Sequence, residues 1–155
     1  MALVLLFVTV VLFSVCEVSM NAVYRVGDSA GWTMIDHPDY KRWASTKRFH
    51  VGDTLIFTYL TQYHDVMEVS HHDYVHCKTN SAKAVYHTGS DSVSLTKPGE
   101  FYFICSNDGH CSAGQKLHIK SSSNNAAIIR NFYLTIATVF ALCIYKTNSL
   151  TDHIN

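Results

Sequence analysis

The chain is short of proline, of charge and of regular helical pattern. It has 2 prolines among 155 residues, and charged residues make up 15%. Its 12 lysines and arginines balance its 12 aspartates and glutamates, so no charge excess favours a polyanionic partner such as nucleic acid. No uninterrupted amphipathic helical pattern runs long within residues 23–120. That stretch has room for one small domain with a modest core, but not for two domains.

Two further absences exclude classes of function. No paired His-x-His element is present, which disfavours a multicopper oxidase, because such an enzyme needs ligands for a second, oxygen-reducing copper cluster. No orienting Asn or Asp stands out for Cys105 and His110 as a nucleophile and base, which disfavours a cysteine hydrolase.

One short segment instead carries a metal-site pattern. Cys105, His110 and Gln115 follow one another at five-residue intervals. A thiolate with imidazole nitrogens and a weak axial ligand is the ligand set of a blue-copper electron-transfer centre, in which Gln can replace an axial Met. A second histidine is needed, and His64, at a loop after an expected strand, is the candidate.

The other histidines are weaker candidates. The chain has 10 histidines, and His71, His72 and His76 lie in one dense run. A zinc or adventitious copper site at His72 and His76, four residues apart, would require a helix. The pair Tyr74-Val75 does not favour a helix, so no such site is expected.

The N-terminal end is apolar. Residues 1–22 resemble a secretory signal peptide, although no Lys or Arg precedes the apolar run. The run is short for a membrane-spanning helix, which needs ~20 apolar residues.

The C-terminal end has two interpretations. A small polar stretch at 121–131 precedes an apolar segment at 132–145, which predicts a glycosylphosphatidylinositol (GPI) anchor signal whose tail is removed. The polar tail at 146–155 leaves open a single span over 126–145, with Lys146 on the inner face. Either interpretation places the domain at the extracellular face of the plasma membrane.

The cysteine count leaves an odd thiol. Of 5 cysteines, Cys16 and Cys143 belong to the apolar ends. The remaining three allow one disulfide in an oxidising compartment, and the third needs a role such as metal ligation. A Cys105–Cys111 bridge with Cys77 free stays possible on this count alone.

Short β-rich runs predict an antiparallel two-sheet sandwich. They are punctuated by Gly-Asp, Lys-Pro-Gly and Asp-Gly turn signals. The expected strands are 23–26, 48–51, 54–60, 66–69, 92–95, 101–104 and 116–119. Short helical turns are expected at 40–45 and 81–86, and a core is expected from Leu55, Phe57, Phe101 and Phe103.

The motifs together resemble plant phytocyanins, of the stellacyanin-like type with an axial Gln. The resemblance covers residues 23–120. Its most specific part is Cys-x4-His-Cys-x3-Gln-Lys at 105–116. The other matching segments are Tyr24–Trp32, Trp43-Ala44, Phe49–Asp53, His64 and Tyr74–Cys77. Asp65 departs from the Asn common in the family and places a negative charge beside the metal.

The resemblance implies a cupredoxin Greek-key sandwich with a Cys77–Cys111 disulfide. It also implies one type 1 copper ion, held by His64, Cys105, His110 and Gln115. The implied function is one-electron transfer by a monomer, not an enzyme, with an unknown small molecule or protein as redox partner. The alternative is a copper-independent cell-surface structural or signalling module like the early nodulin-like proteins, but those have lost ligands and this chain has all four.

Overall fold

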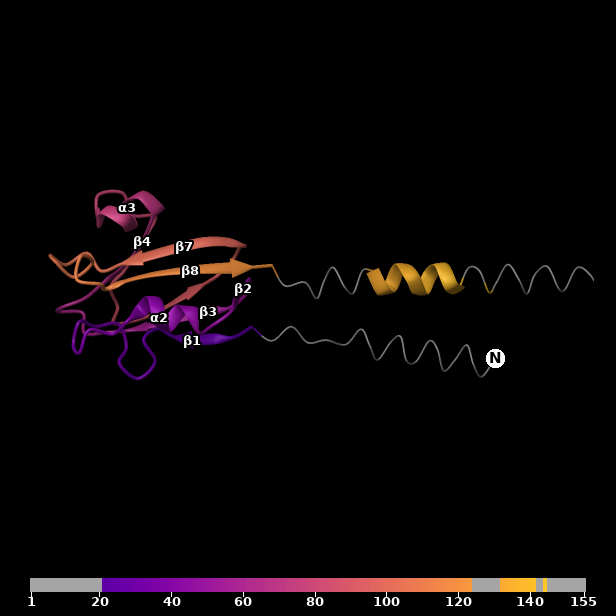
Figure 1. The fold of residues 1–155 in the computed structure, drawn as a ribbon, viewed down its shortest axis with the longest axis horizontal. Helices are drawn as coiled ribbons and strands as arrows, with labels where there is room; N and C mark the ends of the chain where they lie inside the picture. Colours follow the sequence, from indigo (N-terminus) through magenta and orange to yellow (C-terminus); the bar gives the residue numbers. More distant parts are fainter. Residues whose placement is uncertain (1–20, 124–131, 142–143, 145–155) are drawn as a thin grey trace, which may run out of the picture. The chain divides into compact units, whose positions relative to one another are not determined.

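The computed structural model describes residues 21–123, 132–141 and 144 (Figure 1). The chain divides into two units, and the larger compact unit is Asn21–Ser123. The other unit contains the helical residues 132–141. Among the described residues, no helix is both long enough and apolar enough to cross a membrane. The expected leader lies almost wholly outside the described residues, as do the polar tail and much of the anchor region.

The larger unit contains two β-sheets (Figure 1). The smaller sheet has the order β1 (Val23–Arg25), β3 (Thr54–Thr58), β6 (Ser90–Ser94). The larger sheet has the order β2 (Phe49–His50), β8 (Lys116–Ser122), β7 (Gly99–Ile104), β4 (Val66–Val69), β5 (Ala84–Tyr86). The predicted all-β two-sheet architecture is therefore confirmed, and β8 continues two residues past residue 120.

Two details of the predicted sandwich are wrong. The sheets are mixed, because β1 pairs in parallel with β3 and β2 pairs in parallel with β8. Both pairs join strands distant in sequence, which permits the crossover connection that parallel strands need. The helical turn expected at 81–86 is also absent, since Ala84–Tyr86 form β5 and pair antiparallel with β4. The other expected turn is confirmed as helix α2 (Tyr40–Ser45).

The core follows the alternation of side chains along the strands. Phe101, Phe103 and Cys105 are buried in the same cluster as Leu55 and Phe57 of the other sheet. Successive side chains of a strand face opposite sides of the sheet. Ile104, between Phe103 and Cys105, accordingly belongs to a second cluster on the other face. Strand β7 is thus buried on both faces where it enters the loop that begins at Cys105.

The second cluster lies beneath a helix that the sequence did not lead us to expect. Residues His71–His76 form helix α3, so the argument from Tyr74-Val75 against a helix is wrong. The Ser70 hydroxyl accepts a hydrogen bond from the Asp73 backbone N–H, and Cys77 ends the helix in the left-handed conformation. Caps at both ends compensate for the modest helix propensity of the residues between them.

Candidate metal centre

A turn between β3 and β4 places His64. The backbone N–H groups of Tyr63 and His64 both donate to the Leu60 carbonyl, each at 3.0 Å. The side chain of His64 is buried, with 8% of the residue exposed. The turn therefore directs this imidazole into the protein rather than into solvent.

The loop from residue 105 to residue 115 supplies the other three expected ligands. The Cys105 N–H donates to the Gln115 carbonyl at 3.1 Å, which extends the β7–β8 pairing by one step. The Gln115 N–H donates to the His110 carbonyl at 2.9 Å. These two hydrogen bonds close the loop and hold the backbones of the three residues in fixed positions.

Three ligand atoms converge at this loop. Cys105 Sγ lies 3.4 Å from His110 Nδ1 and 4.0 Å from His64 Nδ1, and the two Nδ1 atoms are 3.3 Å apart. Metal bonds of about 2.0–2.3 Å at trigonal angles require ligand atoms about 3.5–3.8 Å apart. The measured separations bracket that range, so the triangle fits one metal ion. Of the described residues, these form the one group of three or more His, Cys, Asp or Glu side chains suited to a metal.

Gln115 is the fourth expected ligand, and its surroundings fit that role. Its side chain is fully buried, yet neither amide atom makes a hydrogen bond of ordinary geometry to the described part of the protein. The amide lies close enough to His64 to affect the pKa of that imidazole. An unpaired buried amide is costly, and a metal bound by its oxygen would compensate for that cost.

Burial sets the protonation states of the metal-free centre. Burial, followed by the proximity of His110, lowers the pKa of His64, so this imidazole is neutral and able to bind a metal. Burial raises the pKa of the Cys105 thiol, and hydrogen bonds from the backbone of Asp65 and Asn107 oppose this shift. The thiol therefore keeps its proton at neutral pH, and metal binding must release it.

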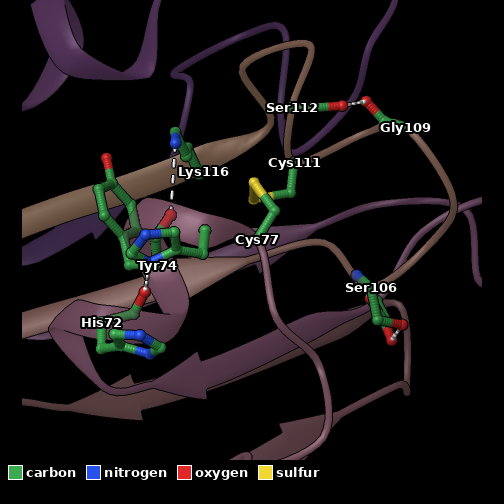
Figure 2. The surroundings of a disulfide bond; sticks show 10 residues. His72, Tyr74, Cys77, Ser106, Gly109, Cys111, Ser112 and Lys116 are labelled. Atoms are coloured by element: carbon green, nitrogen blue, oxygen red, sulfur yellow. Dashed lines mark hydrogen bonds between the residues drawn. A yellow bond between two sulfur atoms is a disulfide. The ribbon is translucent and has the colours of Figure 1, made fainter.

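A disulfide next to the centre resolves the cysteine count. Figure 2 shows the bond between Cys77 and Cys111, the residue directly after His110. Cys105 is the free, buried cysteine of the described chain. The implied pairing is confirmed, and the Cys105–Cys111 alternative is wrong. The bridge joins the end of α3 to the loop that carries His110.

Asp65 joins the two ligand-bearing segments, a role that the sequence did not suggest. Its carboxylate accepts a 2.7 Å hydrogen bond from the Ser106 N–H and another from the Ser106 hydroxyl. Its backbone carbonyl accepts a 2.8 Å hydrogen bond from Trp32 Nε1 in the core. The Asn107 amide donates to the Tyr63 carbonyl in the same region. The available signal in the sequence was position, because Asp65 directly follows His64 and Ser106 directly follows Cys105.

An apolar hollow opens beside the two imidazoles. Its volume is about 610 Å³, and both His64 and His110 line it. Exposed apolar side chains at its edge include Ile35, Leu60 and Tyr63. The hollow gives an approach to the imidazoles from outside the protein.

A mixed β-sandwich with a buried histidine, a buried cysteine and a half-buried histidine converging between its loops defines the cupredoxin class of metal-binding protein. Residues 32–115 match the family model described as a plastocyanin-like domain. The chain belongs to this family, and the resemblance to phytocyanins is confirmed.

Three comparisons describe the similarity. Stellacyanin of Toxicodendron vernicifluum is 43% identical over 100 residues, which cover 63% of this chain and 94% of that protein. A blue copper protein of Pisum sativum is 41% identical over 126 residues, and the match covers 81% of this chain and 65% of the pea protein. The solved structure of cucumber stellacyanin with Cu²⁺ has a TM-score of 0.62 at 35% identity, covering 68% of this chain and all of that one.

Proposed function

We propose that the protein is a one-electron carrier that holds one type 1 copper ion. His64, Cys105 and His110 would supply the strong ligands to this ion, and the amide oxygen of Gln115 would supply a fourth, weaker one. The observation that carries the proposal is the fully buried Gln115 amide beside the His-Cys-His triangle, which makes no hydrogen bond of ordinary geometry within the described residues. A stability role alone would not favour an unsatisfied amide at that position.

Copper supplies a redox couple that alternates between the cuprous and cupric states. The chain contributes a frame that changes little between them. The closed 105–115 loop fixes Cys105 and His110, the disulfide anchors the residue after His110, and Asp65 holds the His64 segment to Ser106. The buried thiol of Cys105, whose pKa is raised by burial, would release its proton on binding the ion. A rigid ligand set reduces the rearrangement that accompanies electron transfer.

The apolar hollow is the proposed point of electron exchange. Because both imidazoles line it, a redox partner seated there comes close to the metal ligands without reaching the buried thiol. The partner is either a small molecule or a protein.

Voltammetry of the copper-loaded protein tests this function. One reversible one-electron wave, with copper retained through repeated cycles, is the expected result. Loss of copper on reduction would contradict an electron carrier and would favour the alternative, a copper-independent structural or signalling module.

We propose that the mature domain spans about residues 23–120 and lies at the extracellular face of the plasma membrane. Support comes from the apolar leader at 1–22 and from the small polar residues and apolar segment after the domain. Cleavage after Ala22 would begin the mature chain at Val23, the first residue of β1, and would remove the hydrogen bonds of Ala22 with Asp53 and Thr54. We place the attachment residue within 121–125, and Ser121 and Ser122 of this stretch lie in β8.

A phospholipase specific for glycosylphosphatidylinositol tests the anchor. Release of the protein from intact cells is expected. Retention, together with detection of residues 146–155 by mass spectrometry of the mature chain, would establish the single-span alternative instead.

A further inference from the structure

Helix α3 presents two histidines on one exposed face. His72 and His76 are four residues apart, and side chains at this spacing are neighbours on a helix. Their ring centroids are 4.5 Å apart with an interplanar angle of 36°. The His72 side chain is 62% exposed, and His76 is also exposed. The helix that this pairing requires is therefore present, and solvent ions can reach both rings.

The hydrogen bonds of the two rings leave the same nitrogen of each ring available. His76 Nδ1 donates to the His72 backbone carbonyl at 2.8 Å, because a carbonyl can only accept. His72 Nδ1 lies 3.2 Å from the Asp73 carboxylate. Among the described residues, no hydrogen bond occupies either Nε2 atom. Metal-binding histidines commonly donate their other ring N–H to a carboxylate or backbone carbonyl, which fixes the ring and makes the free nitrogen more basic.

The helix is a firm support for the pair. Ser70 caps its start, with its hydroxyl also donating to Asp73 at 2.8 Å. Cys77 ties its end to Cys111, and Lys116 Nζ donates to the Tyr74 carbonyl at 3.3 Å (Figure 2). The Tyr74 ring packs against Tyr102 of β7 with centroids 5.3 Å apart. The two rings are therefore held close together before any ion arrives, which lowers the entropy cost of binding.

We propose that His72 and His76 form a second, surface metal site that binds a divalent transition metal through their two Nε2 atoms. Imidazole ligands suit Cu²⁺, Ni²⁺ and Zn²⁺ rather than Mg²⁺ or Ca²⁺. Water completes the coordination, since the site is exposed. The site is separate from the buried centre. The Cys77–Cys111 disulfide links the two sites, because His76 directly precedes Cys77 and His110 directly precedes Cys111.

Binding of a second Cu²⁺ to the copper-loaded protein tests the site. Aqueous Cu²⁺ is titrated into protein whose buried centre is already blue, and binding is followed by calorimetry and electron paramagnetic resonance. The wild type is expected to bind a further equivalent with an imidazole signal distinct from that of the thiolate centre. His72→Ala and His76→Ala are each expected to weaken this binding at least tenfold.

The matched control is His71→Ala on the same helix. The His71 ring packs against Tyr102, with centroids 5.2 Å apart, and takes no part in the proposed pair. This variant should bind the second Cu²⁺ as the wild type does, and an unchanged blue band in every variant reports an intact fold. The proposal is overturned if wild-type protein binds no second equivalent, if both alanine variants bind it with wild-type affinity, or if His71→Ala weakens it equally. None of these outcomes bears on the blue centre itself.

Discussion

Replacing Gln115 with Leu should stabilise the metal-free protein and reduce the further stabilisation that copper provides. The Gln115 side chain is fully buried, and neither amide atom makes a hydrogen bond of ordinary geometry to the described part of the protein. A buried unsatisfied polar group costs about 1–3 kcal/mol, and Leu is of similar size. The metal-free Gln115→Leu protein should therefore be about 1–3 kcal/mol more stable than the wild type. For a domain of this size, that gain raises the melting temperature by about 4 °C or more.

Copper should stabilise the variant less than it stabilises the wild type. A ligand stabilises the folded state according to its affinity, and Leu offers no axial oxygen to the cupric ion. The rise in melting temperature on adding Cu²⁺ should therefore be smaller in Gln115→Leu than in the wild type. If the axial contact contributes about 1–3 kcal/mol to the oxidised state, the reduction potential rises by about 45–130 mV, because 59 mV is a factor of ten for one electron.

Calorimetric melting of both proteins, with and without Cu²⁺, measures these effects. Gln62→Leu is the matched control, because the same chemical change at an exposed position should alter stability by less than about 0.5 kcal/mol. A metal-free Gln115→Leu protein that is less stable than the wild type would refute the reasoning, since Gln115 would then be a structural residue with partners of its own.

Three further predictions concern the same loop. Gln115→Met should raise the reduction potential measured by voltammetry, but less than Leu does; no rise in either variant would mean that Gln115 is not axial. Cys77→Ala should lower the free energy of unfolding measured in urea by about 4 kcal/mol, which is the value for a disulfide that closes a loop with a sequence separation of 34. The blue band should remain. A lost band with unchanged stability would contradict this prediction. Asp65→Asn removes a charge while keeping hydrogen bonds to Ser106. The lost interaction between this charge and the metal is worth about 1–2 kcal/mol at an effective dielectric constant near 20, so the reduction potential should rise by about 40–90 mV. An unchanged potential would contradict a charge effect.

Most of the strands could be predicted from local pattern. The run at 66–69 was placed at its observed bounds, and the alternation in 101–104 identified Phe101 and Phe103 as core residues. The parallel pairing of β1 with β3 could not be predicted, because it depends on how the intervening chain crosses between strands. Strand β5 was missed for a similar reason, since three residues at 84–86 become a strand only through pairing with β4.

Helix α3 shows the limit of propensity arguments. Tyr74 and Val75 are indifferent helix formers, yet the helix begins at a Ser70-x-x-Asp73 cap that was visible in the sequence. Packing of Tyr74 on Tyr102 and the disulfide at Cys77 then hold the helix against the sheet. Those contacts come from distant residues and were not available to a local argument.

The candidate ligands could be selected from spacing and family resemblance, but their convergence could not. Cys105 and His110 share one loop, so their proximity was foreseeable. His64 lies 41 positions before Cys105, and its imidazole reaches the thiol only because the β3–β4 turn faces that loop. The hydrogen bonds from Ser106 to Asp65 that hold the two segments together involve side chains with no motif of their own.

The central claim is that Cys105 is a copper thiolate. Its most direct test is the visible absorption spectrum of the copper-loaded wild type beside that of Cys105→Ser. Because Cys105 is not in the disulfide, the variant should fold, as far-ultraviolet circular dichroism can verify. We expect an intense thiolate-to-copper charge-transfer band in the wild type and none in Cys105→Ser. A blue band that persists in the folded variant would contradict the assignment.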